Sequence, residues 1–289
     1  MDGAVLVDKP RGITSNAALQ AAKRLLKARK AGHAGTLDPL ATGLLILLFG
    51  EATKFAGSLL EDDKEYVATL KLGERTATGD AEGDVLETRP VAVPSLEVLS
   101  RFKGEILQTP PMHSALKRQG VPLYRLARKG ETVEREPRKV TIRELEVVRF
   151  ESPELVLRVR CSKGTYIRAL AEDIGEAMGC GAHLATLRRT GSGRFRVERA
   201  VSPERVSAAD VLPLAVLLEG MPRVELDADA EARLRNGQVL HVPGLQEGAC
   251  AVFDRDGAVI GLGHSEKAAL RAVRLTDASL KRLKNIDKH

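Results

Sequence analysis

Six apolar residues in an unbroken row, Leu44 to Phe49, follow directly on a glycine-punctuated loop at residues 32–43. A short apolar run bounded by turn residues is typical of a fully buried strand. This is the longest such run in the chain, and it is far shorter than the roughly 20 residues that a membrane-spanning helix needs. The sequence therefore predicts a core strand over 44–49 and no membrane span.

Other segments carry strand and helix patterns. Apolar runs and period-two alternation predict strands over 4–7, 66–72, 140–150, 155–161 and 195–198. Helical spacing predicts helices over about 16–29, 95–102 and 166–178. Thr14 or Ser15 can cap the first of these helices, and Gly179 ends the last.

The character of the chain shifts near Met221 and Pro222. The remainder, 223–289, contains a short helical stretch from Ala230 to Gly237 and two apolar runs joined by residues 254–257. An Asp-Gly turn between apolar runs is a good hairpin signal. The sequence thus predicts a small, strand-rich second domain at 223–289.

The charge balance favours a polyanionic partner, above all nucleic acid. The 289 residues include 45 Lys and Arg against 39 Asp and Glu, which gives a net charge of +6 and a pI near 9.3. Residues 117–139 alone hold eight basic and three acidic side chains. Such an excess suits phosphate groups. The basic residues at 23–30 fit a solvated helix face or an RNA-facing one equally well.

Composition excludes several other classes. Cys161, Cys180 and Cys250 are odd in number and far apart, which predicts reduced thiols in a cytoplasmic protein rather than disulfides or a zinc knuckle. The N-terminus shows no secretory signal. Scarce aromatic residues, with no Trp, argue against broad stacking platforms for single strands. The absence of a GxxxxGK[ST] motif disfavours a nucleotide-phosphate site.

Asp38 is the first candidate for chemistry. It precedes Pro39, which pushes its backbone toward an extended conformation, and nearby glycines permit tight turns. A carboxylate held on a shaped loop beside a buried strand is well placed for catalysis. The alternative from local sequence is a structural role, because Asp-Pro is a common turn dipeptide.

Three further features allow more than one interpretation. His33 is the only histidine in its loop, which argues against a metal site and favours a structural or substrate-positioning role. The segment 163–168 enters a predicted helix, whose N–H groups together with Lys163 and Arg168 suit either a phosphate or a plain surface helix start. Residues 187–190 suit an exposed basic strand or a contact with a nucleic-acid backbone.

Five motifs, in order along the chain, together resemble the TruB family of tRNA pseudouridine synthases. Gly32 to Gly43 (GHAGTLDPLATG) resembles the catalytic motif of that family. The other four are Val7 to Ser15, Lys64 to Tyr66, Gln108 to Lys117, and Lys163 to Arg168 with Leu187 to Thr190. One departure is His113, where family members often have Tyr.

The resemblance implies an isomerase that converts uridine at position 55 in the T-loop of tRNA to pseudouridine, with no cofactor and no metal. It implies an α+β fold, in which a mixed, mainly antiparallel sheet is flanked by helices. The catalytic domain would span 1–222, with an RNA-clamping insertion at about 108–139. A PUA-like RNA-binding domain would span 223–289.

The resemblance also implies roles for individual residues. Asp38 would be the catalytic carboxylate, paired with Arg168, and Tyr66 would stack on the uracil and assist proton removal from C5. The expected substrate-binding or supporting residues are His33, Lys9, Asp80, Tyr166, Leu187, Lys117, Arg128 and Lys163. Here His33 would fill the space that a flipped base leaves, and Asp80 would orient a neighbouring arginine or the base pocket.

Two alternatives remain open. The same scaffold could serve a non-catalytic RNA-binding protein or a tRNA-folding chaperone, although such a protein need not keep Asp38, Tyr66 and Arg168 together. A guide-RNA-dependent synthase is the other alternative, which the short chain and the 108–139 insertion disfavour. We expect a cytoplasmic monomer that binds the T-arm of tRNA without an obligate protein partner and without a membrane.

Overall fold

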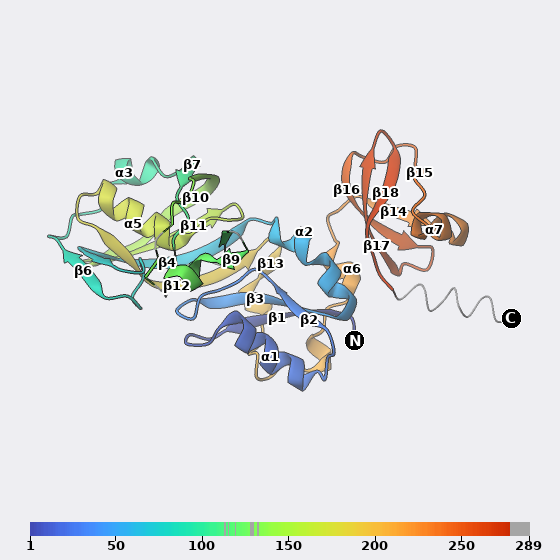
Figure 1. Cartoon of the computed structure of the whole chain (residues 1–289), viewed down its shortest axis with the longest axis horizontal. Coiled ribbons are helices and arrows are strands. Elements are labelled where there is room, and N and C mark those ends of the chain that lie inside the picture. Colours follow the sequence, from blue (N-terminus) through green and yellow to red (C-terminus); the bar gives the residue numbers. More distant parts are fainter. Residues whose placement is uncertain (113, 115, 119, 128–129, 132, 278–289) are drawn as a thin grey trace.

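A computed structural model describes residues 1–277 except 113, 115, 119, 128–129 and 132. A nine-stranded sheet forms the larger part, with strand order β1-β3-β12-β4-β11-β10-β7, and β2 and β13 join it through β3 and β12 (Figure 1). Its strands are β1 (Gly3–Lys9), β2 (Ala31–Ala34), β3 (Thr42–Phe49), β4 (Lys64–Leu72), β7 (Gly104–Gln108), β10 (Arg138–Glu151), β11 (Glu154–Cys161), β12 (Ala182–Ser192) and β13 (Phe195–Arg196).

The predicted core strand is confirmed. Strand β3 pairs with both β1 and β2, and residues 43–49 are all buried. Alternate side chains enter two different cores: Leu44 and Ile46 pack on one face of the sheet, while Leu45 and Leu47 pack on the other. An unbroken apolar run is needed here because both faces of the strand are covered.

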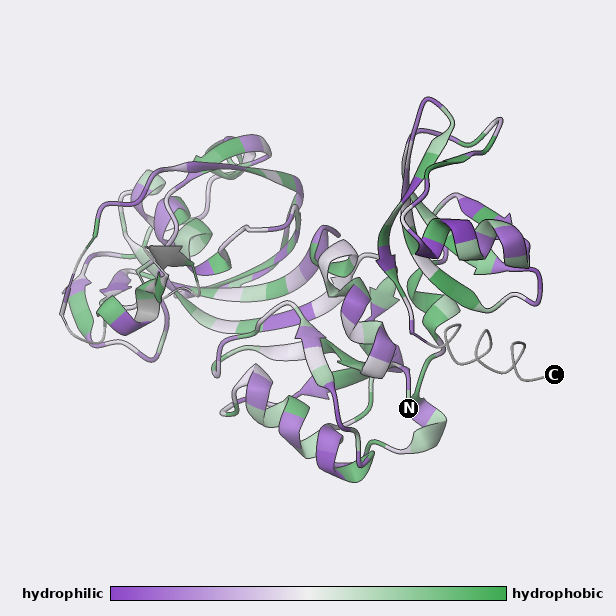
Figure 2. Cartoon of the chain, turned by 45° about the vertical axis from the view of Figure 1, so that its right-hand side comes forward, coloured by the Kyte–Doolittle hydropathy of each residue, from purple (hydrophilic) through white to green (hydrophobic). Residues whose placement is uncertain are grey.

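Helices cover the sheet where the hydropathy pattern predicts. Helix α1 (Ser15–Leu25) packs beneath β1 and β3, with hydrophobic and hydrophilic residues interspersed along it (Figure 2). Thr14 caps it, accepting a hydrogen bond of 3.0 Å from the Ala17 amide. The helix ends earlier than the predicted residue 29, because Lys27 adopts a φ of 49° and the chain turns into β2.

The second half of the sheet carries α5 and α3. Helix α5 (Ile167–Ala177) buries Ile167, Leu170 and Ile174 against β4, β11 and β12. The left-handed Gly179 (φ 77°) follows it, as predicted. The remaining elements up to residue 222 are η1 (Gly50–Phe55), α2 (Ala56–Leu60), β5 (Glu74–Thr76), β6 (Val85–Thr88), α3 (Leu96–Ser100), β8 (Lys117–Arg118), β9 (Val121–Pro122), α4 (Leu123–Ala127), η2 (Val197–Arg199), η3 (Ala208–Asp210) and α6 (Leu214–Leu217).

Pairing in this sheet is antiparallel except between β12 and β3. The mixed, mainly antiparallel α+β architecture predicted from the resemblance is therefore confirmed. The strand predicted over 195–198 is only partly correct, since β13 stops at Arg196 and Val197–Arg199 forms a 3-10 turn.

A separate five-stranded sheet, of order β14-β16-β17-β18-β15, begins at Arg223 and lies at the opposite end of the molecule from α3 (Figure 1). Its elements are β14 (Arg223–Leu226), α7 (Ala228–Arg235), β15 (Leu240–His241), β16 (Gly248–Asp254), β17 (Val259–Glu266) and β18 (Ala269–Leu275). The predicted hairpin joins β16 to β17, and Phe253 and Leu262 pack into the same core as Phe55 of η1.

Two absences hold for the part of the chain that the structure describes. No helix there is long and apolar enough to cross a membrane. No group of three or more His, Cys, Asp and Glu side chains there is placed to hold a metal ion. The three cysteines are all buried and unpaired by disulfides.

Candidate active site

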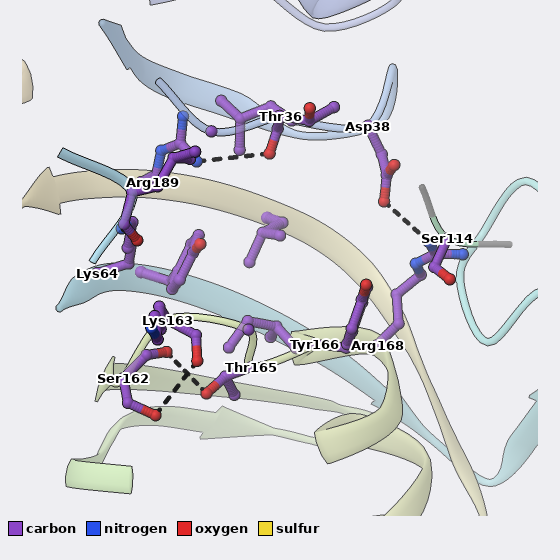
Figure 3. A pocket seen from close by; sticks show the side chains of 17 residues that line it. Thr36, Asp38, Lys64, Ser114, Ser162, Lys163, Thr165, Tyr166, Arg168 and Arg189 are labelled. Atoms are coloured by element: carbon purple, nitrogen blue, oxygen red, sulfur yellow. Dashed lines mark hydrogen bonds and ion pairs between the residues drawn. The ribbon is translucent and has the colours of Figure 1, made fainter. Parts of the chain in front are cut away.

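An open pocket of about 340 Å³ collects side chains from the loop after β2, from β4, from β12 and from the start of α5 (Figure 3). Asp38 is the one carboxylate among the described residues that line it. The lining cations are Lys64, Lys163, Arg168 and Arg189. This excess of positive charge suits a substrate that carries phosphate or develops negative charge.

The local sequence explains how Asp38 is presented. The left-handed Gly35 (φ 88°) turns the chain out of β2, and Leu37 and Leu40 are buried on either side of Asp38. Ser15 fixes this loop through two hydrogen bonds to Leu37, from the Leu37 amide to Ser15 Oγ (2.8 Å) and from Ser15 Oγ to the Leu37 carbonyl (2.9 Å). The Asp38 carboxylate therefore projects from an anchored loop.

Asp38 meets a buried arginine inside the pocket. Its Oδ2 lies 3.0 Å from Nη2 of Arg168, which sits in the first turn of α5. On the other side, Arg168 Nη1 lies 3.4 Å from Asp80 Oδ2 and donates to the Thr78 carbonyl at 3.2 Å. Asp80 is itself buried and accepts from the Thr78 hydroxyl at 2.6 Å. Two carboxylates thus share one guanidinium group, which fixes its orientation.

Tyr66 and Leu187 form the floor between β4 and β12. Tyr66 lies directly opposite Arg189 in the antiparallel pairing, and Leu187 lies opposite Ala68. Burial raises the pKa of the Tyr66 phenol, and the nearby charge of Arg189 opposes that rise. Tyr66 is therefore a buried, neutral hydroxyl at neutral pH in the free protein.

Tyr166 and Lys163 line the same pocket from the segment that leads into α5. The backbone of Tyr166 is held by Gln108, whose side chain accepts from the Tyr166 amide (2.7 Å) and donates to its carbonyl (3.0 Å). Lys163 is exposed and paired with Glu61. A phosphate would therefore have to compete with Glu61 for Lys163.

Lys9 and His33 lie behind the pocket rather than among its lining residues. The Lys9 ammonium is fully buried at the end of β1 and donates to the carbonyls of Pro10 (3.0 Å) and Ile13 (2.8 Å). Burial lowers the pKa of Lys9 to about 8. His33 on β2 contacts the Gly35 carbonyl through Nδ1 (3.2 Å), and burial lowers its pKa as well.

Two of the residues expected to contact RNA, Lys117 and Arg128, fall within 108–139. Lys117 begins β8, which pairs with β9. Arg128 and His113 lie outside the described residues. Ser114, between them, reaches the pocket and is buried.

Family models match most of the chain in three consecutive pieces. Residues 23–167 match the TruB family pseudouridylate synthase N-terminal domain. Residues 168–215 match the tRNA pseudouridylate synthase B C-terminal domain, and residues 222–276 match the pseudouridine synthase II TruB C-terminal model. The chain belongs to the TruB family of pseudouridylate synthases.

Curated relatives of this TruB-family chain are similar to it in sequence over nearly its whole length. The tRNA pseudouridine synthase B of Burkholderia mallei (strain NCTC 10247) is 52% identical over 292 residues, which cover 95% of this chain and 97% of the relative. The protein of the same name from Azoarcus sp. (strain BH72) is 51% identical and covers 95% of each chain.

Solved structures extend the likeness to the fold. A chain from the crystal structure of a Cbf5-Nop10-Gar1 complex is similar with a TM-score of 0.72 and 29% identity, covering 94% of this chain and 84% of that one. A chain from an H/ACA RNP bound to a substrate RNA containing 2′-deoxyuridine gives a TM-score of 0.69 at 27% identity, with coverage of 94% and 84%. The fold of this TruB-family chain is therefore the pseudouridine synthase fold.

Two cations that line the pocket, Lys64 and Arg189, are not among the site residues expected from the sequence. Strand periodicity could have found them, because Lys64 lies two residues before Tyr66 and Arg189 two residues after Leu187, on the same face of each strand. The interpretation of 187–190 as an exposed strand is wrong for Arg189, which is 2% exposed in the middle of the sheet.

Proposed function

We propose that this protein isomerises uridine at position 55 in the T-loop of tRNA to pseudouridine. The observation that carries the proposal is the half-exposed carboxylate of Asp38, which faces an open, positively charged pocket and is ion-paired to the buried Arg168. The named activity of the relatives, tRNA pseudouridine synthase B, agrees with it.

The reaction rearranges bonds without any net gain or loss of atoms. The N1–C1′ glycosidic bond breaks, the uracil turns, and C5 bonds to C1′. The proton on C5 leaves, and N1 takes up a proton. No oxidant, reductant or phosphate donor enters this balance.

Asp38 supplies the group that this chemistry needs. An ordinary Asp carboxyl, with a pKa of about 4, is ionised at neutral pH. Its charge could add to the base, attack C1′ or remove a proton from the sugar, and each route requires a carboxylate aimed into the pocket. Arg168 orients the Asp38 carboxylate toward the pocket, because Asp80 and the Thr78 carbonyl hold the guanidinium group from its other side.

Tyr66 and Leu187 would receive the base. An aromatic ring and an aliphatic side chain on adjacent strands provide apolar surfaces for a uracil ring. We propose that the Tyr66 hydroxyl assists removal of the C5 proton. Tyr166, which lines the pocket, and His33, which lies behind it, would support the bound and flipped conformations of the RNA.

The target base lies inside a folded loop and must leave its stack, which costs a few kcal/mol and is offset by contacts in the pocket. Lys117, Arg128 and the other basic residues of the 108–139 insertion would supply phosphate contacts, which position the T-arm without reading bases. Residues 223–289, as a PUA-like domain, would add contacts outside the 1–222 catalytic domain. We expect a cytoplasmic monomer that needs no protein partner.

Turnover and binding, measured together, test this assignment. Tritium release from tRNA that carries 5-³H-uridine reports turnover, and filter binding reports affinity. Asp38→Asn is expected to abolish release while tRNA affinity stays within about threefold, since the change removes charge but little shape. Asp84→Asn, an exposed residue outside the pocket, is the matched control and should retain wild-type release.

Two outcomes would count against the proposal. Tight binding with no release by the wild type would favour the RNA-binding or guide-dependent alternatives. Loss of affinity and turnover by the same factor in Asp38→Asn would show that Asp38 serves binding rather than chemistry.

A further inference from the structure

Arg189 is a buried cation with no carboxylate partner among the described residues. Its side chain is 2% exposed at the centre of β12. Nε donates to the Leu44 carbonyl at 2.7 Å. Nη1 reaches the Thr36 carbonyl at 3.5 Å (Figure 3). Burying an unpaired charge is costly. A buried charge without a carboxylate partner therefore indicates a role other than packing.

The strand register places this charge beside Tyr66. Arg189 and Tyr66 are direct cross-strand partners, so their side chains leave the sheet on the same face, about 5 Å apart at Cβ. Both residues line the pocket that contains Asp38. The preceding residue, Arg188, points to the opposite face and pairs with Asp8 at 2.7 Å.

The loop at residues 35–41 that carries Asp38, here called the catalytic loop, and strand β3 both lie close to Arg189. A Cβ atom placed on Gly35 would lie 3.4 Å from Arg189 Nη1, and one on Gly43 would lie 2.2 Å from the Arg189 carbonyl oxygen. Both glycines have positive φ, which other residues rarely adopt. The loop therefore approaches the Arg189 guanidinium group at Gly35, and β3 lies directly against the Arg189 backbone at Gly43.

Arg189 is also the cation that acts most directly on Tyr66. The titratable groups that face Tyr66 are Arg189 from β12, Cys161 from β11 and Asp38 from the catalytic loop. Burial raises the pKa of Tyr66, while the charge of Arg189 and its hydrogen bond to the phenol lower that pKa. Lys64, Lys163 and Arg168 line the same pocket.

We propose that Arg189 is a positioning residue of the reaction, anchored by the Leu44 and Thr36 carbonyls, that orients the Tyr66 hydroxyl and stabilises negative charge on it. This inference rests on the proposed isomerisation, in which Tyr66 assists proton removal. It assigns a function to a charge that would otherwise only destabilise the fold.

A double-mutant cycle tests whether Arg189 acts through Tyr66. Single-turnover tritium release is measured for wild type, Arg189→Gln, Tyr66→Phe and the double variant, with tRNA affinity in parallel. Arg189→Gln should slow the wild-type enzyme by tenfold or more, with affinity changed by less than about threefold. In the Tyr66→Phe background the same change should slow the reaction by less than about threefold.

A purely structural role would give the opposite result. Equal rate losses in both backgrounds, or a loss of affinity that matches the loss of rate, would overturn the proposal. Arg189→Lys is run in the same cycle, because it keeps the charge but replaces the planar fork of donors with a point charge. Arg189→Lys should also slow the reaction more when Tyr66 is present than in the Tyr66→Phe background. The test therefore remains possible if Arg189→Gln fails to fold.

A second readout does not depend on activity. The chain has three tyrosines, so fluorotyrosine labelling gives three fluorine NMR signals, and Tyr66→Phe identifies the one from Tyr66. Arg189→Gln should move that signal and raise its titration midpoint, because the charge of Arg189 lowers the pKa of Tyr66, while Arg188→Gln should leave the signal and its midpoint unchanged. An unmoved Tyr66 signal in Arg189→Gln overturns the inference even if wild-type turnover is established. Absent wild-type turnover with a shifted signal would instead contradict the proposed function alone.

Discussion

The ion pair between Arg168 Nη2 and Asp38 Oδ2, at 3.0 Å, joins a side chain that is 7% exposed to one that is 47% exposed. The cation is thus fixed within the protein, while the anion remains accessible to a substrate. This asymmetry gives a carboxylate a defined direction without burying it. The ion pair limits the rotation of the Asp38 carboxylate but leaves the carboxylate accessible from the pocket.

Asp80 should matter for turnover although it lies behind Arg168. Asp80→Asn keeps the shape but removes the charge that holds Arg168 from behind. Hydrogen bonds to charged groups contribute about 1.5–3 kcal/mol, which corresponds to a rate loss of roughly 10- to 100-fold. Single-turnover tritium release checks this, with the exposed neighbour Asp84→Asn as control. Equal rates for the two variants would contradict a role for Asp80 in orienting Asp38 through Arg168.

Gly43 should be intolerant of a side chain. It has a φ of 100°, and an added Cβ would lie 2.2 Å from the Arg189 carbonyl oxygen in the parallel pairing of β3 with β12. Gly43→Ala is expected to lower the free energy of unfolding by about 2 kcal/mol or more. Urea denaturation measures this.

Gly57 in α2 provides the matched control, because its φ is ordinary and nothing lies within 4 Å of an added Cβ. Gly57→Ala should be neutral or stabilising by up to about 1 kcal/mol. If the Gly43→Ala protein were as stable as Gly57→Ala, the backbones of β3 and β12 would have room for a methyl group at position 43.

Lys9 should make stability increase with pH in the alkaline range. Its pKa is about 8 in the fold because of burial, against 10.5 in the unfolded chain. Between these values the unfolded chain binds more protons than the folded one, so the free energy of unfolding rises with pH. The full difference corresponds to about 3 kcal/mol.

The measurement is urea denaturation of wild type and Lys9→Met at several pH values between 7 and 10.5. The wild type should gain stability relative to the variant over that range, and Lys103→Met, on the exposed surface, should follow the wild type. Parallel curves for wild type and Lys9→Met would contradict a desolvated ammonium at position 9.

Binding of tRNA should weaken steeply with salt, because phosphate contacts release counterions. If Lys117 makes one such contact, Lys117→Gln should weaken binding at low salt and reduce the log–log salt slope by about one. Its rate at saturating tRNA should stay near that of wild type. Lys103→Gln, at an exposed position, is the control. An unchanged salt slope in Lys117→Gln would contradict a phosphate contact by Lys117.

Local sequence was sufficient for features that depend on short-range chemistry. The buried strand over 44–49, the cap at Thr14 and the stop at Gly179 follow from apolar runs and backbone preferences. The pairing of Asp38 with Arg168, which are 130 positions apart, was expected only from the family resemblance. No local pattern joins two residues so distant in the chain.

The less predictable features depend on tertiary contacts. Arg189 looks like an exposed charge until the parallel pairing of β12 with β3 places it between Leu44 and Tyr66. The early end of α1 reflects the demand that β2 pair with β3, which overrides helical spacing in 26–29. The burial of Arg189 and the end of α1 are thus determined by contacts with residues that lie far away along the sequence.

The most direct test of the account is to map the modified position in a single tRNA. Unmodified tRNA is incubated with wild type or Asp38→Asn, and pseudouridine is located by carbodiimide treatment and primer extension. A second tRNA carries cytidine in place of uridine 55. One stop is expected, at position 55, for the wild type only, and none on the cytidine-substituted tRNA. A stop elsewhere on both RNAs, or an undiminished stop with Asp38→Asn, would contradict it.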